Sequence, residues 1–297
     1  MSRKSELKSA LVAAMNRKGG AHLTREARER TASLFASSMI EAGYTHLVGP
    51  EDVAGKHLKA YVSLRKANGV GSRTLQNELS HLRSALRAAG RSAVADAPEQ
   101  SNEALGISGG VRIGRKTAMP DADRESVVRR AAELNRPGLG CLIDLERYLG
   151  LRGNEAIHAR IDTLKRWRSE LLRDGRISVI EGTKGGRRRE VKTFGIEHAL
   201  SAIDRAIAEA ETSGGFLVLR ADGSPAGGLK HARSIYHSWA FRSGIQPHAA
   251  RYAFAQDQMA GYINSGYSAR EALIAVSHDL GHGDGRGRWV KSVYMRP

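Results

Sequence analysis

The chain has 297 residues, enough for two domains, and 41% of them are hydrophobic, enough to build buried cores. Its 47 lysines and arginines outnumber its 31 acidic residues, and the net charge of +16 favours a polyanionic partner, foremost nucleic acid. The single cysteine, Cys141, excludes a disulfide framework and a cysteine-based zinc site, and no apolar run is long enough to cross a membrane.

The first hundred residues predict a helical domain. One helix is capped by Thr24, a second begins at Pro50, and a third begins at Ser72. Leucines recur at helical spacing in the third helix and are expected in the core: Leu75, Leu79, Leu82 and Leu86. Basic residues of these helices are candidate contacts to the DNA backbone or bases: Lys56, Lys59, Arg73, Arg83 and Arg87.

A linker is expected where the apolar period fades and small, polar and glycine residues dominate. We place a first domain at residues 1–105, the linker at 106–118 and a second domain at 119–297. The basic N-terminal segment is a poor secretory signal, because Lys8 and Asn16 interrupt its apolar run. We therefore expect a cytoplasmic protein associated with DNA in the nucleoid.

The second domain predicts mostly helices with one small sheet. "RISVIEG" and "REVKTF" read as two strands around the turn "TKGGRR", and helices are expected before and after them. The fold class is therefore mainly α with a small β-hairpin. The hairpin tip is basic, with Lys184 at the turn and Arg187 and Arg188 after it. Such a tip is either simply solvated or able to reach into a DNA groove.

Two arginines are candidates for holding a phosphate. Arg152 emerges at the edge of an apolar helix, and Glu155 follows at i+3, close enough to orient it; the alternative is an ordinary surface ion pair. His248 and Arg251 form an H-x-x-R pattern at a helix N-terminus, where an anion docks favourably. The pattern alone also arises by chance in an arginine-rich chain.

The last 17 residues, "GHGDGRGRWVKSVYMRP", combine a glycine-broken basic loop with a short amphipathic segment that carries Tyr294. A tyrosine in a terminal helix usually serves packing. A phenol is also suited to attack a phosphodiester, because the ester that it forms can be reversed by another hydroxyl.

In their order along the chain, Arg152 with Glu155, Lys184, the H-x-x-R pair, Leu280-Gly281-His282 and Tyr294 resemble the tyrosine recombinase (phage integrase) family. The resemblance covers nearly the whole chain and implies a two-domain clamp around double-stranded DNA, with a helical core-binding domain and a mixed α/β catalytic domain. It implies a homotetramer on DNA, monomeric or weakly associated when free, with no metal and no ATP. It also implies a covalent 3′-phosphotyrosine intermediate, and an accessory directionality or bending protein is a further potential partner.

Carried onto this chain, the resemblance gives each residue a role. Tyr294 attacks the scissile phosphate, and Arg152 and Arg251 clamp its oxygens. Lys184 protonates the departing 5′ oxygen, with Arg187 a lesser candidate for this role. His248 exchanges the tyrosine proton, and His282 bonds the phosphate.

The chain departs from the family pattern near its end. Twelve positions separate His282 from Tyr294, a longer interval than the family usually shows, and glycines fill it. This leaves room for Trp289 to pack near the phosphate in place of His282.

The sequence favours a site-specific recombinase of a virus or mobile element. Two alternatives stay open: a type IB topoisomerase, which shares this chemistry and works alone, and a non-enzymatic DNA-binding regulator.

Overall fold

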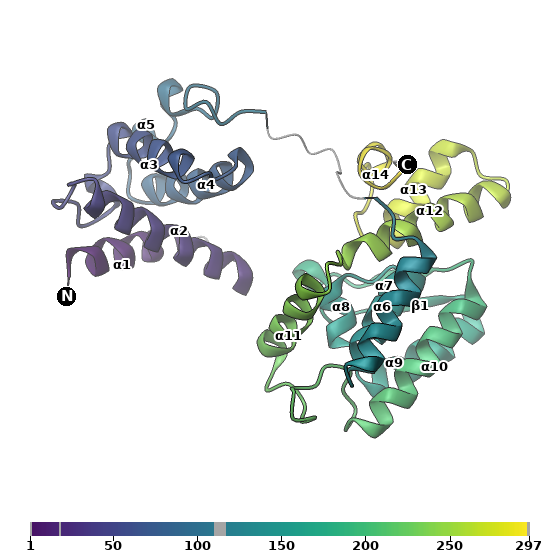
Figure 1. Cartoon of the computed structure of the whole chain (residues 1–297). Helices are drawn as coiled ribbons and strands as arrows, with labels where there is room; N and C mark the ends of the chain where they lie inside the picture. The colour runs from purple at the N-terminus through teal and green to yellow at the C-terminus, as the bar shows by residue number, and fades with distance from the viewer. Residues whose placement is uncertain (1, 18, 110–116, 296–297) are drawn as a thin grey trace. The chain divides into compact units, whose positions relative to one another are not determined.

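The computed structural model describes residues 2–17, 19–109 and 117–295, and for Lys184 the backbone alone. The chain divides into two compact units, Met1–Val111 and Arg112–Pro297. Figure 1 shows that each unit is built mainly of helices. Each unit has its own hydrophobic core.

The first unit is entirely helical in the part that the structure describes. Its elements are α1 Arg3–Asn16, α2 His22–Glu41, η1 Pro50–Asp52, α3 Gly55–Ala67, α4 Ser72–Ala88, α5 Ser92–Ala95 and η2 Pro98–Gln100. Two expected helix starts were wrong. Thr24 lies in the first turn of α2, because the chain enters the helix directly after the positive-φ pair Gly19 and Gly20. Pro50 starts only a 3₁₀ turn, and α3 begins at Gly55.

The core of the first unit contains the leucine stripe of α4, as predicted: Leu75, Leu79, Leu82 and Leu86 are all buried. Leu105 and Ile107 are buried in the same core. The first unit therefore extends past the boundary expected at residue 105. Residues 110–116 of the expected linker lie outside the described residues.

The second unit contains the remaining elements. They are α6 Asp121–Glu133, α7 Pro137–Leu149, α8 Gly153–His158, α9 Ile161–Asp174, β1 Arg176–Val179, η3 Lys184–Gly186, β2 Arg189–Lys192, α10 Ile196–Thr212, α11 Leu229–Arg242, α12 His248–Asn264, α13 Ala269–Asp279 and α14 Gly287–Tyr294. The predicted hairpin is confirmed: β1 and β2 pair antiparallel, with Val179 opposite Arg189. The mainly helical class with one small sheet is thus correct.

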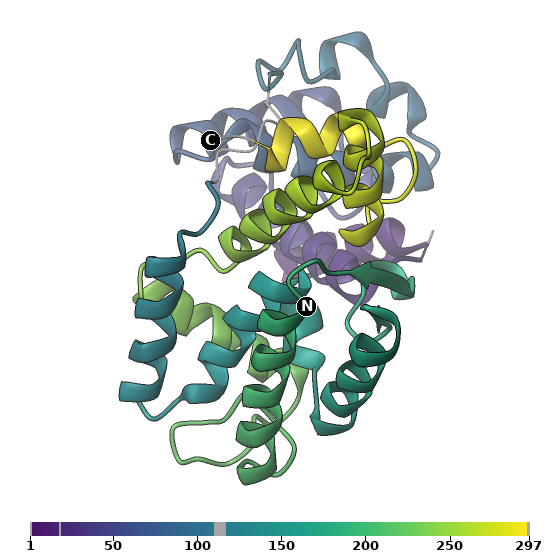
Figure 2. The same ribbon diagram turned by 90° about the vertical axis from the view of Figure 1, so that its right-hand side faces the viewer.

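Helix α7 forms the centre of the second unit. It packs against α6, α10 and α12, and all its residues except Pro137 and Tyr148 are buried. The thiol of Cys141 is buried here, as the apolar stretch around it predicts. Helices α12, α13 and α14 pack together at one end of the unit, which both views show (Figures 1 and 2). This packing brings the end of α14 against the start of α12.

Within the three described stretches of the chain, no helix is long and apolar enough to cross a membrane.

Candidate active site

The turn between α7 and α8 carries the first predicted arginine. Gly150 ends α7 at φ +57°, and a Cβ there would collide with the ring of Phe254, so the turn requires glycine. Arg152 then occupies the N-cap of α8, where its backbone N–H donates to Glu155 Oε2 at 2.7 Å. Its side-chain Nη1 donates to Glu155 Oε1 at 2.6 Å. The expected pair is therefore present, and Glu155 is fully buried.

Arg251 reaches the same turn from the first turn of α12. Its side chain is fully buried, and its two Nη atoms donate to the carbonyl oxygens of Gly150 and Leu280. Arg152 Nη2 donates to the same Leu280 oxygen at 2.9 Å. The two arginines expected to clamp a phosphate therefore converge on one backbone oxygen, which precedes the Gly281-His282 pair.

A third guanidinium, Arg189 on β2, lies beside them, and sequence reasoning missed it. It is buried, and its Nη2 donates to Glu155 Oε2 at 2.6 Å and to Gly150 O at 3.2 Å. Its Nη1 donates to the carbonyl of Asp279. The strand alternation carried the signal, because Arg189 and Val191 share the buried face of β2 while Arg187 and Arg188 before it are exposed.

These guanidinium groups control the ionisation of Glu155. Burial alone would raise the pKa of this carboxyl, but the charges of Arg189, Arg251 and Arg152, with the hydrogen bond from Arg189, lower it to about 2. Burial, followed by repulsion from Arg189, lowers the pKa of Arg251 to about 10. Guanidinium groups stay charged at neutral pH, and one carboxylate, that of Glu155, bonds directly to two of the three. The cluster keeps an excess of positive charge.

Tyr294 is the last residue of α14 and is 1% exposed. Its hydroxyl and Nε2 of His282 share a hydrogen bond of 3.2 Å. The ring lies 4.5 Å from Tyr252 and 5.7 Å from Trp289 between centroids. Trp289 also meets the ring of His282 edge-on at 4.3 Å. Despite the long interval between them in the sequence, His282 thus contacts the phenol of Tyr294, and Trp289 packs against both rings.

The environment of His282 keeps its imidazole neutral. Burial, then the charges of Arg251, Arg152 and Arg189, lower its pKa to about 3. A neutral imidazole can accept a hydrogen bond from the phenol, and the negative charge of a bound phosphate would raise its pKa towards the range in which it can also accept the proton. Arg251 lies near both groups, since its charge lowers the pKa of His282 and Tyr294 in turn influences the pKa of Arg251.

His248 is the first residue of α12 and is half-buried beside the same aromatic rings. Its ring centroid lies 5.5 Å from that of Tyr252 and 6.2 Å from that of Tyr294. The structure therefore brings both predicted histidines to the phenol.

The loop between α13 and α14 explains the long interval. Gly281, Gly283 and Gly285 all have φ near +70°, a conformation that favours glycine. Ser277 Oγ donates to Gly283 O at 3.0 Å, and His278 Nε2 lies 2.9 Å from Asp284 Oδ1. The loop is thus tied back to the end of α13.

The tip of the hairpin, residues 183–188, directly precedes Arg189 in the chain, and the structure describes it only in part. The backbone of Lys184 forms η3 with Gly185 and Gly186, and its side chain lies outside the described part of the structure. Arg187 and Arg188 are exposed. Asn154 of α8 donates to Gly182 O at 2.7 Å, which anchors the loop before Lys184 to the helix that begins at Arg152.

The DNA-binding candidates of the first unit divide into two groups. Lys56, Lys59 and Arg73 are exposed. Arg83 is half-buried and donates to the Gln100 carbonyl and to Asn102 Oδ1, so it holds its own unit together. Arg87 pairs with Asp96 at 2.5 Å on the surface. The first three are the stronger candidates for contacts with a polyanion.

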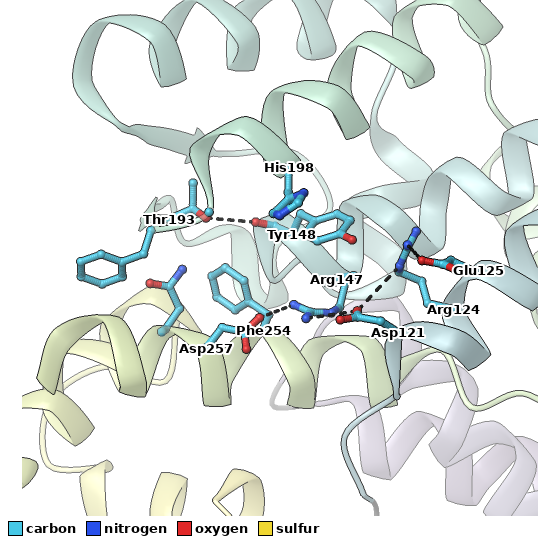
Figure 3. A pocket seen from close by; sticks show the side chains of 12 residues that line it. Asp121, Arg124, Glu125, Arg147, Tyr148, Thr193, His198, Phe254 and Asp257 are labelled. Carbon is cyan, nitrogen blue, oxygen red and sulfur yellow. Dashed lines mark hydrogen bonds and ion pairs between the residues drawn. The ribbon is translucent and has the colours of Figure 1, made fainter. Parts of the chain in front are cut away.

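A separate cavity of about 520 Å³ opens on the second unit, and Figure 3 shows it. Tyr148 lies under the guanidinium groups of Arg124 and Arg147 and stacks on His198 at 5.5 Å. Arg147 pairs with Asp257 at 2.5 Å, and both residues line the cavity. Its lining includes none of the six predicted catalytic residues.

Among the described residues, no group of three or more histidine, cysteine, aspartate or glutamate side chains could hold a metal ion.

Two family models match the chain. One is described as Integrase and matches residues 106–257, and one is described as Phage integrase, N-terminal, and matches residues 4–95. The first spans half of the chain and includes Arg152, Lys184, His248 and Arg251, but it ends before Tyr294. No curated protein matches the chain.

Solved structures share the fold of the whole chain. The Tn1549 transposon integrase, in complex with transposon right-end DNA, is 16% identical with a TM-score of 0.64, covering 100% of this chain and 96% of that one. A lambda integrase dimer bound to a COC′ core site is 16% identical with a TM-score of 0.58, and the match covers 96% of this chain and 94% of that one. The XerH site-specific recombinase, bound to a palindromic difH substrate, is 16% identical with a TM-score of 0.58, and the match covers 97% of this chain and 80% of that one.

Proposed function

Because the chain belongs to the phage integrase family of tyrosine recombinases, we propose that it cleaves and rejoins double-stranded DNA at specific sites through a covalent 3′-phosphotyrosine intermediate. The observation that carries the proposal is the hydrogen bond between Tyr294 and a neutral His282, beside guanidinium groups in excess of their carboxylate. A phenol has an ordinary pKa of about 10, so its attack at neutral pH needs a proton acceptor and a positive pocket.

In the proposed cleavage step, the Oη of Tyr294 forms a bond to the scissile phosphorus, and the bond from phosphorus to the 5′ oxygen breaks. Arg152 and Arg251 bind the non-bridging oxygens, where negative charge increases in the transition state. Their present partners, the carbonyls of Gly150 and Leu280, are acceptors that phosphate oxygens can replace. Lys184 gives a proton to the departing 5′ oxygen, and rejoining reverses each transfer.

The phenolic proton passes to a histidine. The hydrogen bond at 3.2 Å favours His282 as its acceptor, whereas the family resemblance assigns that proton to His248 and the phosphate to His282. His248 lies beside the same rings and remains the second candidate. Trp289 fixes the orientation of His282 by edge-on packing.

We further propose that the reaction needs neither metal nor ATP, because the arginines supply the positive charge and the phosphotyrosine retains the energy of the cleaved bond. The first unit binds DNA through Lys56, Lys59 and Arg73, and the hairpin residues Arg187 and Arg188 add contacts. A homotetramer forms on two DNA sites of a virus or mobile element, with an accessory protein setting direction.

The test uses nicked suicide DNA that carries the boundaries of the genetic element around the gene. Wild-type protein is expected to form a covalent adduct, with or without EDTA, and a phosphotyrosyl peptide is expected to contain Tyr294. Tyr294→Phe is expected to form none. Tyr252→Phe removes the neighbouring buried hydroxyl and is expected to keep the adduct.

Other outcomes would support the alternative functions. Relaxation of supercoiled plasmid without a cognate site or recombinant products indicates a type IB topoisomerase. Site-specific binding without any adduct indicates a DNA-binding regulator. A strict Mg²⁺ requirement for cleavage contradicts the proposal.

A further inference from the structure

Arg189 lies where three segments of the second unit meet. It is the first residue of β2, opposite Val179, and its side chain points to the buried face of the hairpin. From there it contacts the α7–α8 turn through Gly150 O, helix α8 through Glu155, and the end of α13 through the carbonyl of Asp279. One side chain thus joins the hairpin to both turns that hold the catalytic arginines.

The two carboxylate oxygens of Glu155 accept hydrogen bonds from two different guanidinium groups. Arg152 Nη1 donates to Oε1 and Arg189 Nη2 donates to Oε2, each at 2.6 Å. The backbone N–H of Arg152 also donates to Oε2. With both oxygens occupied, the carboxylate has one orientation, and this orientation sets the direction of the Arg152 guanidinium.

Arg189 also packs against the turn that precedes His282. A Cβ built on Gly281 would lie 2.5 Å from Arg189 Cδ and 3.5 Å from Arg152 Nη1. The aliphatic stem of Arg189 therefore fits against a glycine that has no side chain. The Leu280 carbonyl beside this glycine accepts from both Arg152 and Arg251.

We propose that Arg189 is a positioning residue for DNA cleavage, acting through Glu155 and the Leu280–Gly281 turn to aim the guanidinium of Arg152. This inference rests on the proposed function. We assign the phosphate to Arg152 and Arg251, whose guanidinium groups converge on the Leu280 oxygen, whereas Arg189 donates to Glu155, Gly150 O and Asp279 O instead. The low pKa of Glu155 agrees, since Arg189 contributes the largest of the charge effects that lower it.

The experiment measures single-turnover cleavage of nicked suicide DNA and, separately, binding of the same DNA. Arg189→Met is expected to slow cleavage by about 10²-fold, as for a small misplacement of a catalytic group, while DNA binding changes little. Glu155→Gln is expected to give a similar loss, and the double variant is expected to be no slower than the worse single variant. Arg189→Lys keeps a charge for Glu155 and is expected to restore part of the rate.

The matched control is Arg176→Met, which removes an exposed arginine of the same hairpin that pairs with Glu190 at 3.3 Å. It is expected to cleave at the wild-type rate. Wild-type protein and Tyr294→Phe in the same assay show whether the covalent step exists, so a failure of the proposed function is distinguished from a failure of this inference.

A wild-type rate for Arg189→Met would overturn the inference, and so would losses that multiply in the double variant. If thermal unfolding shows that Arg189→Met does not fold, Arg189→Lys decides the matter. Slower cleavage by Arg189→Lys, with a wild-type melting temperature and unchanged DNA binding, supports the positioning role. A wild-type cleavage rate for this variant contradicts it.

Discussion

The two units each bury a glutamate beside arginine, with different outcomes. In the first unit, Glu78 accepts from Tyr61 Oη at 2.8 Å and from Arg65 at 2.8 and 3.2 Å. One carboxylate there meets one guanidinium. In the second unit, Glu155 bonds to two guanidinium groups, and a third lies beside them with only carbonyl partners.

The comparison separates a structural ion pair from an anion site. The charges of the Glu78 network cancel, so the network fixes α3 against α4 and has little attraction left for a ligand. The Glu155 cluster keeps excess positive charge beside the phenol of Tyr294, the proposed nucleophile, and two imidazoles. Buried arginine alone therefore does not identify the site, whereas arginine in excess of carboxylate does.

The largest expected effect comes from removing a charge in each region. Arg251→Met is expected to slow cleavage by about 10² to 10³-fold, because one donor to the transition-state charge is lost. Arg65→Met is expected to lower the free energy of unfolding by about 3 to 5 kcal/mol, because it leaves Glu78 buried without its partner. Suicide-substrate kinetics and denaturant unfolding of both variants check the contrast. Equal effects of the two changes on cleavage by folded protein would contradict it.

Glu146 sharpens the comparison, because it is a buried carboxyl near Arg251 with no guanidinium bonded to it. Its Oε1 accepts from Tyr236 Oη at 2.5 Å, and burial raises its pKa from 4.5 to about 8. The folded protein keeps this proton where the unfolded chain has released it. The free energy of unfolding is therefore expected to fall as pH rises from about 4.5 to about 8, by up to roughly 1.4 kcal/mol per pH unit.

Thermal unfolding at pH 6 and pH 9 checks this expectation. Glu146→Gln, which cannot ionise, is expected to lose less stability than wild type between the two pH values. Parallel losses in the two proteins would show that Glu146 does not hold its proton.

A pair of glycine changes tests how closely the arginine cluster is packed. Gly281→Ala and Gly285→Ala carry the same backbone strain, about 1 kcal/mol, because both residues have φ near +70°. Only the first places a Cβ against Arg189, while the second meets open space. Gly281→Ala is expected to slow cleavage by about 10-fold more than Gly285→Ala, as for a small displacement of the cluster. Identical rates for the two variants would argue against close packing.

The smallest expected effect concerns the surface arginines of the first unit. Arg87 is already paired with Asp96, so Arg87→Ala is expected to cost less than about 1 kcal/mol of stability and little DNA affinity. Arg73→Ala is expected to weaken binding more and to reduce the salt dependence by about one phosphate contact. Binding titrations at several salt concentrations distinguish the two. A larger loss for Arg87→Ala would reverse the assignment.

Local sequence patterns predicted the parts of the site that depend on neighbouring residues. The spacing of Arg152 and Glu155 gave their pair, and a proline before His248 gave the helix that brings Arg251 inward. The hairpin was predictable from the alternation of its two strands around a glycine turn. In each case the physical cause lies within a few residues along the chain.

Contacts between distant segments were not predictable in this way. The alternation of β2 indicates that Arg189 faces the core, but it does not specify the distant partners Glu155, Gly150 and Asp279 that Arg189 meets there. The bond between His282 and Tyr294 depends on how the glycine loop folds back, which its composition does not specify. The burial of Ile107 likewise depends on packing against helices far earlier in the chain.

The carbonyl oxygens around the guanidinium groups have a consequence for selectivity. A small free anion would have to displace the oxygens of Gly150 and Leu280 with nothing else to compensate for their loss. A long polymer of phosphates brings many additional contacts, and these can drive the exchange at one of its links. Under the proposed function, these carbonyl oxygens compete with small anions for the guanidinium groups and disfavour their binding, whereas a DNA duplex can displace them.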